Sequence, residues 1–166
     1  GRIWTHLAPA PSPPARDSAS FVLDSRVGRM ILFAGAYAYA NGAYLNDTWS
    51  FDAGNATWTN RTTTVSPPAR VGAGMVYDSL ADRTILYGGS ACTAAAGCGV
   101  TGDLWSYDYG TNRWTALFPA GGPFLGREGA GMVYDARADR VILFGGVDAG
   151  NAYSNQTWAY DATTAT

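Results

Sequence analysis

The sequence predicts an all-β protein made of three repeats of a four-stranded unit, and three observations carry this prediction. The heptapeptide GAGMVYD occurs at residues 72–78 and again at 129–135, and a weaker copy, SASFVLD, stands at 18–24. Each copy is followed by an apolar run and then by a tryptophan motif. No window of helical length places apolar residues at the 3.6-residue period of a helix, so the repeat and its strand-like segments define the fold.

The first two strands of each unit form a predicted hairpin. The second strands are the apolar runs GRMILFAG at 28–35, DRTILYGG at 82–89 and DRVILFGG at 139–146. β-Branched and aromatic residues bounded by Asp, Arg and Gly are typical of strands joined by turns. The closing glycine pair, replaced by Ala34-Gly35 in the first unit, favours a positive φ or a close approach of two backbones.

The third and fourth strands each carry a tryptophan. The third-strand motifs are NDTWSFD at 46–52, GDLWSYD at 102–108 and NQTWAYD at 155–161. The fourth-strand motifs are NATWTNR at 55–61, TNRWTAL at 111–117 and GRIWTHL at 1–7, the last standing ahead of the first repeat. Alternation of aromatic and small polar residues is typical of half-buried strands. The predicted organisation is an outer strand at 1–7 and repeats at 16–61, 70–117 and 127–161, the last without its own outer strand.

This pattern resembles the kelch repeat, which has four strands in about 50 residues. The longer first hairpin, with Asp24 five residues before Arg29 and the same spacing in the other repeats, is similar to microbial kelch repeats related to the galactose oxidase propeller domain. The resemblance implies a β-propeller in which each repeat supplies one blade around a central axis. This chain would supply three blades, as half of a six-bladed ring or as part of a longer propeller.

The blade geometry explains where small and large residues stand. Glycine and alanine on the inner strands fit where the blades converge, and the tryptophans fill the wider wedge between blades, each burying on the order of 200 Å². An arginine precedes every inner strand, at Arg16, Arg70 and Arg127. We expect these arginines to form hydrogen bonds between blades, the less favoured alternative being a ligand site.

Composition narrows the class of protein. With 47% hydrophobic and 14% charged residues, 166 residues suit one packed domain. The net charge is −2 and all eleven cations are arginine, which gives no basic footprint for nucleic acid. No run of 18 apolar residues predicts a membrane span. Without an initiator methionine or a signal segment, a mature or trimmed amino terminus is expected.

Catalytic side chains are scarce. The chain has one histidine, His6, one glutamate, Glu128, and no lysine. His6 lacks partners for a metal site, and the copper site of galactose oxidase needs more than one histidine, so His6 is predicted to be a surface or interface residue. The recurring aspartates are explained by turns and by pairing with arginine. The sequence therefore predicts no catalytic residue, no metal site and no cofactor.

Two features favour a location outside the cell. The only cysteines, Cys92 and Cys98, stand in one Gly- and Ala-rich loop, where a disulfide would contribute about 2 kcal/mol. The alternative is two free thiols. N-x-S/T sequons begin at Asn46, Asn55, Asn60 and Asn155. About one sequon is expected by chance, so we predict glycosylation, the alternative being that Asn and Thr serve only as turn and strand residues.

The loops between second and third strands differ most between repeats. In a propeller these loops emerge on one face, and here they carry the candidate binding residues Tyr37, Tyr39, Asn41, Tyr44, Asp148, Asn151 and Tyr153. Aromatic and amide side chains together suit sugar stacking or a protein contact. The alternative is that the tyrosines only pack the loops against the blade edges.

The sequence favours a non-catalytic module for binding or structural assembly, outside the cell or on its surface. The expected partner is a second copy of the chain or the remainder of a longer propeller, with glycans or surface proteins as ligands and neither nucleic acid nor a membrane span. The first alternative is a lectin-like propeller that binds carbohydrate. The less favoured alternative is part of a larger propeller enzyme, and an intracellular adaptor is disfavoured because no partner domain is present. A shared fold does not decide among these functions.

Overall fold

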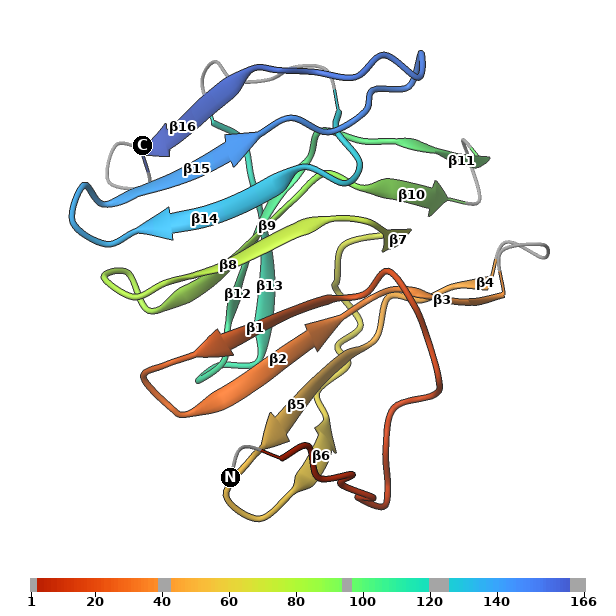
Figure 1. The fold of residues 1–166 in the computed structure, drawn as a ribbon, viewed down its shortest axis with the longest axis vertical. Coiled ribbons are helices and arrows are strands. Elements are labelled where there is room, and N and C mark those ends of the chain that lie inside the picture. The colour runs from red at the N-terminus through yellow and green to blue at the C-terminus, as the bar shows by residue number, and fades with distance from the viewer. Residues whose placement is uncertain (1–2, 39–42, 94–96, 120–125, 162–166) are drawn as a thin grey trace.

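The computed structural model describes residues 3–38, 43–93, 97–119 and 126–161. The regular secondary structure of these residues consists of β-strands, without helices. Three antiparallel sheets form the body of the protein and correspond to the three repeats. Figure 1 shows them stacked one on the next, with their inner strands β1, β8 and β14 as neighbours. The chain therefore has the blades of a kelch-type propeller.

Each blade runs in chain order from its inner to its outer strand. Blade 1 contains β1 (Ser20–Asp24), β2 (Arg29–Phe33), β5 (Thr48–Asp52) and β6 (Thr57–Asn60). Blade 2 contains β8 (Gly74–Asp78), β9 (Arg83–Tyr87), β12 (Leu104–Asp108) and β13 (Arg113–Leu117). Blade 3 contains β14 (Gly131–Asp135), β15 (Arg140–Phe144) and β16 (Thr157–Asp161).

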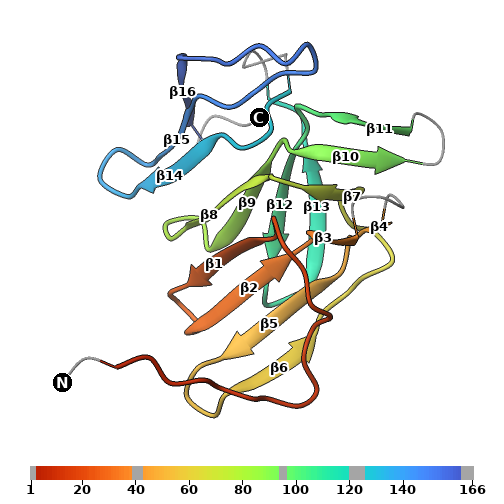
Figure 2. The ribbon, with the colours of Figure 1, turned by 45° about the vertical axis from the view of Figure 1, so that its right-hand side comes forward.

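Smaller sheets form at one end of the blades. They contain β3 (Ala36–Ala38) with β4 (Ala43–Tyr44), and β7 (Ala69–Val71) with β10 (Ser90–Thr93) and β11 (Gly97–Val100). In each repeat, the segment that leads into the inner strand pairs with the segment after the second strand: Asp17 with Ala36, Arg70 with Ala91, and Glu128 with Val147. The hairpins between second and third strands consequently emerge on the same side of all three blades (Figure 2).

The D-x-x-x-x-R spacing folds as a capped turn. In blade 1, the Asp24 carboxylate accepts hydrogen bonds from the backbone N–H groups of Arg26 and Val27, at 3.0 and 3.3 Å. Asp24 then lies opposite Arg29 in the hairpin register. Asp78 and Asp135 cap the corresponding turns of the other blades. The carboxylate satisfies backbone donors that the turn would otherwise leave without a partner.

Packing between blades supplies the hydrophobic core. Trp114 of blade 2 is 1% exposed. Its ring centroid lies 4.7 Å from that of Phe33 in blade 1 and 4.9 Å from that of Tyr107 in its own blade. Its Nε1–H donates to Thr48 Oγ1 of blade 1 at 2.9 Å. An outer-strand tryptophan therefore fills the wedge between two blades, as the repeat pattern predicts.

The glycine pair brings neighbouring blades into backbone contact. Gly89 has a φ of +91°, and a Cβ at this position would lie 2.5 Å from the carbonyl oxygen of Val71. Its N–H donates to the carbonyl of Arg127 in blade 3 at 2.8 Å. Gly35 makes the same bond to the carbonyl of Arg70, at 2.9 Å. Both a positive φ and a close approach are thus present.

Two sequence-based expectations are not met within the single chain as stated. Residues 3–7 of the outer strand predicted at 1–7 form no strand here, and Ile3 and Trp4 are 84% and 103% exposed, so the strand stays a prediction for a chain that has a partner blade. A strand needs an open edge to pair with, and the edge of β16 lies at the opposite end of the stack from this segment (Figure 2). The expectation that these arginines form hydrogen bonds between blades holds only for the main chain: the carbonyls of Arg70 and Arg127 accept from Gly35 and Gly89 of the preceding repeat. The arginine side chains bond within their own repeat, as described below.

Candidate binding face

The loop face, which we define as residues 36–38, 43–45, 90–93, 97–100 and 147–154, contains most of the predicted binding residues. Tyr37 on β3 and Tyr153 in blade 3 are 64% and 92% exposed, whereas Tyr44 on β4 is half-buried. Tyr39 and Asn41 lie outside the described residues. The fold thus places two exposed aromatic rings on separate hairpins of one face.

The two other predicted binding residues shape a turn. The Asp148 carboxylate accepts hydrogen bonds from the N–H groups of Gly150 and Ala152, at 2.8 and 3.0 Å. These two backbone N–H groups lower the pKa of Asp148 below its ordinary value, and the larger contribution comes from Ala152. Asn151 has a positive φ of +60° and donates its N–H to the Asp148 carbonyl at 3.0 Å. Both residues therefore organise the hairpin that presents Tyr153.

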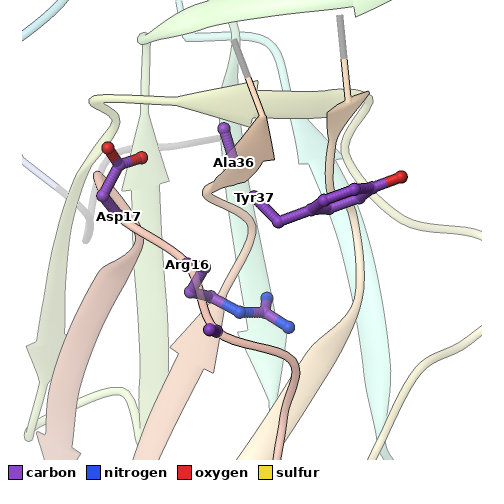
Figure 3. Close-up of a pocket in the computed structure, with 5 residues that line it drawn as sticks. Arg16, Asp17, Ala36 and Tyr37 are labelled. Carbon is purple, nitrogen blue, oxygen red and sulfur yellow. The ribbon is translucent and has the colours of Figure 1, made fainter. Parts of the chain in front are cut away.

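A pocket of about 260 Å³ borders the first hairpin. Its lining residues are Ala15, Arg16, Asp17, Ala36 and Tyr37. Figure 3 shows the Arg16 guanidinium and the Tyr37 ring pointing to one side, with the Asp17 carboxylate pointing to the other. Arg16 is already bonded to Asp47, so the Tyr37 ring is the surface that this side offers to a ligand.

An arginine, an aspartate and a tryptophan form a triad beneath this face in each of the first two blades. The Arg70 guanidinium makes two hydrogen bonds to the Asp103 carboxylate, both at 2.7 Å, and its side chain is fully buried. The indole N–H of Trp105 donates to the same carboxylate at 2.6 Å. Arg16, Asp47 and Trp49 repeat this arrangement in blade 1.

The triad sets the charge of its carboxylate. Burial alone raises the pKa of Asp103, but the hydrogen bonds and positive charge of Arg70 outweigh it and leave the pKa below its ordinary value. The carboxylate is therefore ionised at neutral pH and locks the lead-in strand to the third strand of its own blade. The sequence shows that the arginine and the D-x-W motif recur in the first two repeats, but it does not show that the arginine pairs with the aspartate of its own repeat.

The third repeat departs from this pattern. Gln156 replaces the aspartate and lies 3.4 Å from Arg127 Nη2, while the Trp158 indole N–H donates to the Gln156 Oε1 at 3.3 Å. The Asp148 carboxylate lies 3.8 Å from Arg127 Nη1. Arg127 thus has a looser and less charged setting than its two counterparts.

The middle hairpin is covalently closed. A disulfide joins Cys92 on β10 to Cys98 on β11, and these residues lie directly opposite each other in the strand register. β10 also pairs with β7, which carries the buried Arg70. The hairpin is consequently tied to the body of blade 2.

The four sequon asparagines are all exposed: Asn46, Asn55, Asn60 and Asn155. Asn60 uses its side-chain oxygen to accept from the Thr62 N–H at 2.9 Å. Asn46 instead donates its side-chain amide to Ser66 Oγ at 3.3 Å. The surface position of each asparagine is compatible with a glycan.

The remaining candidate chemistry is sparse across the part of the chain that the structure describes. His6 is exposed on the segment before blade 1. Glu128 pairs through its backbone with Val147. Within the described ranges, no group of three or more His, Cys, Asp or Glu side chains is arranged to hold a metal ion. The same residues include no helix long and apolar enough to cross a membrane.

The comparison with known families agrees with this geometry. The family model of the KLHDC2/KLHL20/DRC7 Kelch-repeats domain matches residues 2–166. The matched range includes all three blades and the whole loop face.

Proposed function

The chain belongs to the kelch-repeat family, whose domains are generally non-enzymatic scaffolds that bind proteins, and we propose that it is itself a protein-binding module. We further propose that it acts outside the cell or on its surface and that it binds its partner through the loop face. The observation that carries the proposal is the convergence of three unlike hairpins on one side of a rigid stack of blades. Binding residues are often placed on variable loops that a rigid scaffold positions.

Tyr37 and Tyr153 are the proposed contact residues. They are the exposed tyrosines of the loop face, and tyrosine is enriched among residues that dominate binding energy. Their hairpins are fixed at the base by backbone pairing of Asp17 with Ala36 and of Val147 with Tyr153. The rings are therefore presented by ordered backbone.

Selection from a display library of secreted proteins, followed by surface plasmon resonance, tests this assignment. The double variant Tyr37→Ala, Tyr153→Ala should weaken a selected partner at least tenfold, since hot-spot truncations cost about 2 kcal/mol or more. Leu80→Ala is the matched control, because Leu80 is 65% exposed but lies in the β8–β9 turn. Equal affinity of the double variant and the wild type would contradict the assignment.

Carbohydrate binding is the second candidate. It is favoured by the 92% exposed ring of Tyr153 beside the polar hairpin of Asp148 and Asn151, because an open ring can stack on a sugar face. A glycan array separates the candidates. Binding that Tyr153→Ala abolishes would support the lectin, and an array without binding would leave the protein partner favoured.

The proposed location rests on the disulfide and the sequons. Disulfides persist in oxidising compartments, and all four sequon asparagines are exposed. The intact mass of native protein from a source that glycosylates proteins should exceed the peptide mass and fall after enzymatic removal of N-glycans. A native mass equal to the peptide mass, with thiols that alkylate without reductant, would contradict the location.

The outward face of blade 3 supports a further blade as partner. Val133 and Phe144 are 60% and 56% exposed on this face. At the same repeat positions in blade 2, Val76 and Tyr87 are each 6% exposed because blade 3 covers them. Val133 and Phe144 therefore form the same kind of apolar surface on blade 3 that blade 3 itself covers on blade 2.

Blade 1 exposes the complementary face. Phe21 and Leu23 are 54% and 48% exposed, whereas Tyr77, which matches Leu23 in blade 2, is 8% exposed. Wherever two successive blades meet in this chain, a face like the exposed one of blade 3 packs against a face like the exposed one of blade 1. We propose that they are covered by further kelch blades, from a second copy of the chain or from the remainder of a longer propeller; an assembly of two copies would bring six blades together.

Sedimentation velocity tests the second-copy form. Wild-type protein should sediment as an oligomer at micromolar concentration, and Phe144→Asp should be monomeric because a buried charge without a partner is costly. Leu80→Asp also replaces an exposed apolar side chain with a carboxylate, but in the β8–β9 turn, so this variant should assemble like the wild type. A folded wild-type monomer would contradict assembly from copies and favour the longer propeller.

A further inference from the structure

We propose that the free edge of β11, residues Gly97–Val100, is a docking site for an extended peptide segment of a protein partner, and that the Cys92–Cys98 disulfide holds this edge in strand form. The inference rests on the proposed protein-binding function and names how one part of the loop face would act. The partner segment would add a strand to the β7–β10–β11 sheet.

The position of β11 in its sheet leaves one side open. The strand order is β11-β10-β7, so β11 is the outermost strand, and among the described residues it pairs only with β10. The β10–β11 hairpin projects beyond the blades on the side of the loop face (Figure 2). An incoming strand would meet the edge of the sheet from solvent.

The register shows which backbone groups face the open side. Thr101 donates its N–H to the Gly89 carbonyl at 2.9 Å, so these two residues form a hydrogen-bonded pair. Hydrogen-bonded and non-hydrogen-bonded pairs alternate along an antiparallel ladder, so Cys92 and Cys98, three places along, do not exchange hydrogen bonds. The N–H and C=O of Cys98 therefore point away from β10. Val100, two residues along and opposite Ser90, repeats this orientation. Cys98 and Val100 thus offer two donors and two acceptors at strand spacing.

The edge lacks the features that normally prevent strand addition. Exposed edges are usually protected by charged residues, proline or bulges. Gly97–Val100 contains no charged residue and no proline, and its register with β10 is uninterrupted. A Cβ built at Gly97 or Gly99 would meet no atom within 4 Å, so side chains of a docked strand have room beside them.

The disulfide and the sheet behind it keep the edge ordered. A two-stranded hairpin of this length is marginal in water without further support. Here Cys92 is bonded to Cys98 across the pair and lies opposite Ala69 on the other side, and the neighbouring Arg70 is fixed by Asp103. The corresponding β3–β4 hairpin has an irregular register and no cysteine. The middle hairpin is therefore the one built to present an edge.

The chemistry of the edge defines the ligand class. Recognition would come from the backbone of an extended segment, and the neutral edge with two glycines favours uncharged, small or β-branched side chains. Val100, half-buried, offers one apolar contact on the same face of the sheet as the side chain of Cys98.

A phage-displayed heptapeptide library selected against the immobilised, oxidised chain supplies the probe. In the complex of the chain with a selected peptide, the amide protons of Cys98 and Val100 should exchange with solvent at least tenfold more slowly. Val100→Pro removes one outward N–H while proline is tolerated on an edge, so it should weaken binding at least tenfold. Val100→Ala keeps that N–H and should bind within about threefold of the wild type.

The disulfide is tested with the same peptide. The Cys92→Ser, Cys98→Ser variant should bind more weakly and show faster exchange in β10 and β11, while exchange in β8 and β9 stays unchanged. Protection confined to the hairpins of Tyr37 and Tyr153 would overturn strand docking and leave the protein-binding function standing. Enrichment of no peptide, or equal binding by the proline and alanine variants, would also overturn it.

Discussion

Replacing Asp103 with Asn removes the counterion of a fully buried arginine with little change in side-chain shape. Arg70 makes two 2.7 Å hydrogen bonds to the Asp103 carboxylate, and asparagine can accept only one of them. Removing one partner of a buried ion pair costs about 3–5 kcal/mol. The Asp103 side chain is 32% exposed, so solvent screens part of the loss, and we expect about 3 kcal/mol, the low end of this range.

The third repeat supplies the matched control. Gln156 already places an amide against Arg127, so Gln156→Glu makes the reverse change, from amide to carboxylate, with the same side-chain length. This variant should raise the free energy of unfolding by about 1 kcal/mol, because the bond to Arg127 becomes charge-assisted. The nearby Asp148 already neutralises part of the charge of Arg127, which keeps the gain small.

Urea unfolding followed by tryptophan fluorescence measures both changes. The slope of free energy against urea should be unchanged if the variants alter stability alone. A loss below about 1 kcal/mol for Asp103→Asn would refute the argument, since that is the range of exposed ion pairs. Destabilisation by both variants would refute it too, because opposite changes should have opposite signs.

The same variant predicts a change in pH dependence. The pKa of Asp103 is lowered in the folded protein, chiefly because Arg70 outweighs the effect of burial. Its contribution to stability is therefore complete above the unfolded pKa of about 3.9 and is lost as the pH falls toward the folded value. Asp103→Asn should flatten the loss of stability below about pH 4 relative to the wild type.

Two further substitutions test the packing between blades. Trp114→Phe should cost about 2–3 kcal/mol in urea unfolding, because it leaves a cavity and removes the bond to Thr48; a cost below about 1 kcal/mol would contradict the wedge role. Gly89→Ala should cost at least about 2 kcal/mol, because its φ is +91° and the new Cβ would meet the Val71 carbonyl. Gly99→Ala, with open space around it and an ordinary φ, should be nearly neutral, and equal losses for the two glycine variants would refute this account.

The repeat pattern was sufficient to predict the blades because strand signals and turn residues recur in register. Asp24, Asp78 and Asp135 each cap the same turn, so local chemistry and repetition agree. The direction of the arginine side chains was not predictable in this way. A period shows that Arg70 and Asp103 recur, but whether Arg70 meets the aspartate of its own blade or of the next depends on tertiary geometry.

The candidate binding face was predicted less completely than the blades. The sequence identified the variable hairpins, and the structure places Tyr37 and Tyr153 on them as exposed rings. The sequence alone could not distinguish these exposed tyrosines from Asp148, whose carboxylate accepts hydrogen bonds from the backbone of its own turn. The edge of β11 was missed because its ligand-binding groups are backbone N–H and C=O, which no side-chain motif encodes.

The three repeats differ most in the hairpins of the loop face and least in the residues that pack between blades. Positions that pack between blades tolerate little change, because Phe33 and Tyr87 are each covered by the next blade. The hairpins beyond the glycine pair project past the blades (Figure 2), and they differ in content: one carries Tyr37 and Tyr44, one a disulfide and one the Asp148 turn. In blade 3, Gln156 stands where the other repeats have the triad aspartate, and the Asp148 carboxylate lies 3.8 Å from Arg127 Nη1. The Asp148 hairpin thus supplies a carboxylate near the buried Arg127 where the triad position is an amide, which couples the sequence of the loop face to the stability of the blade beneath it.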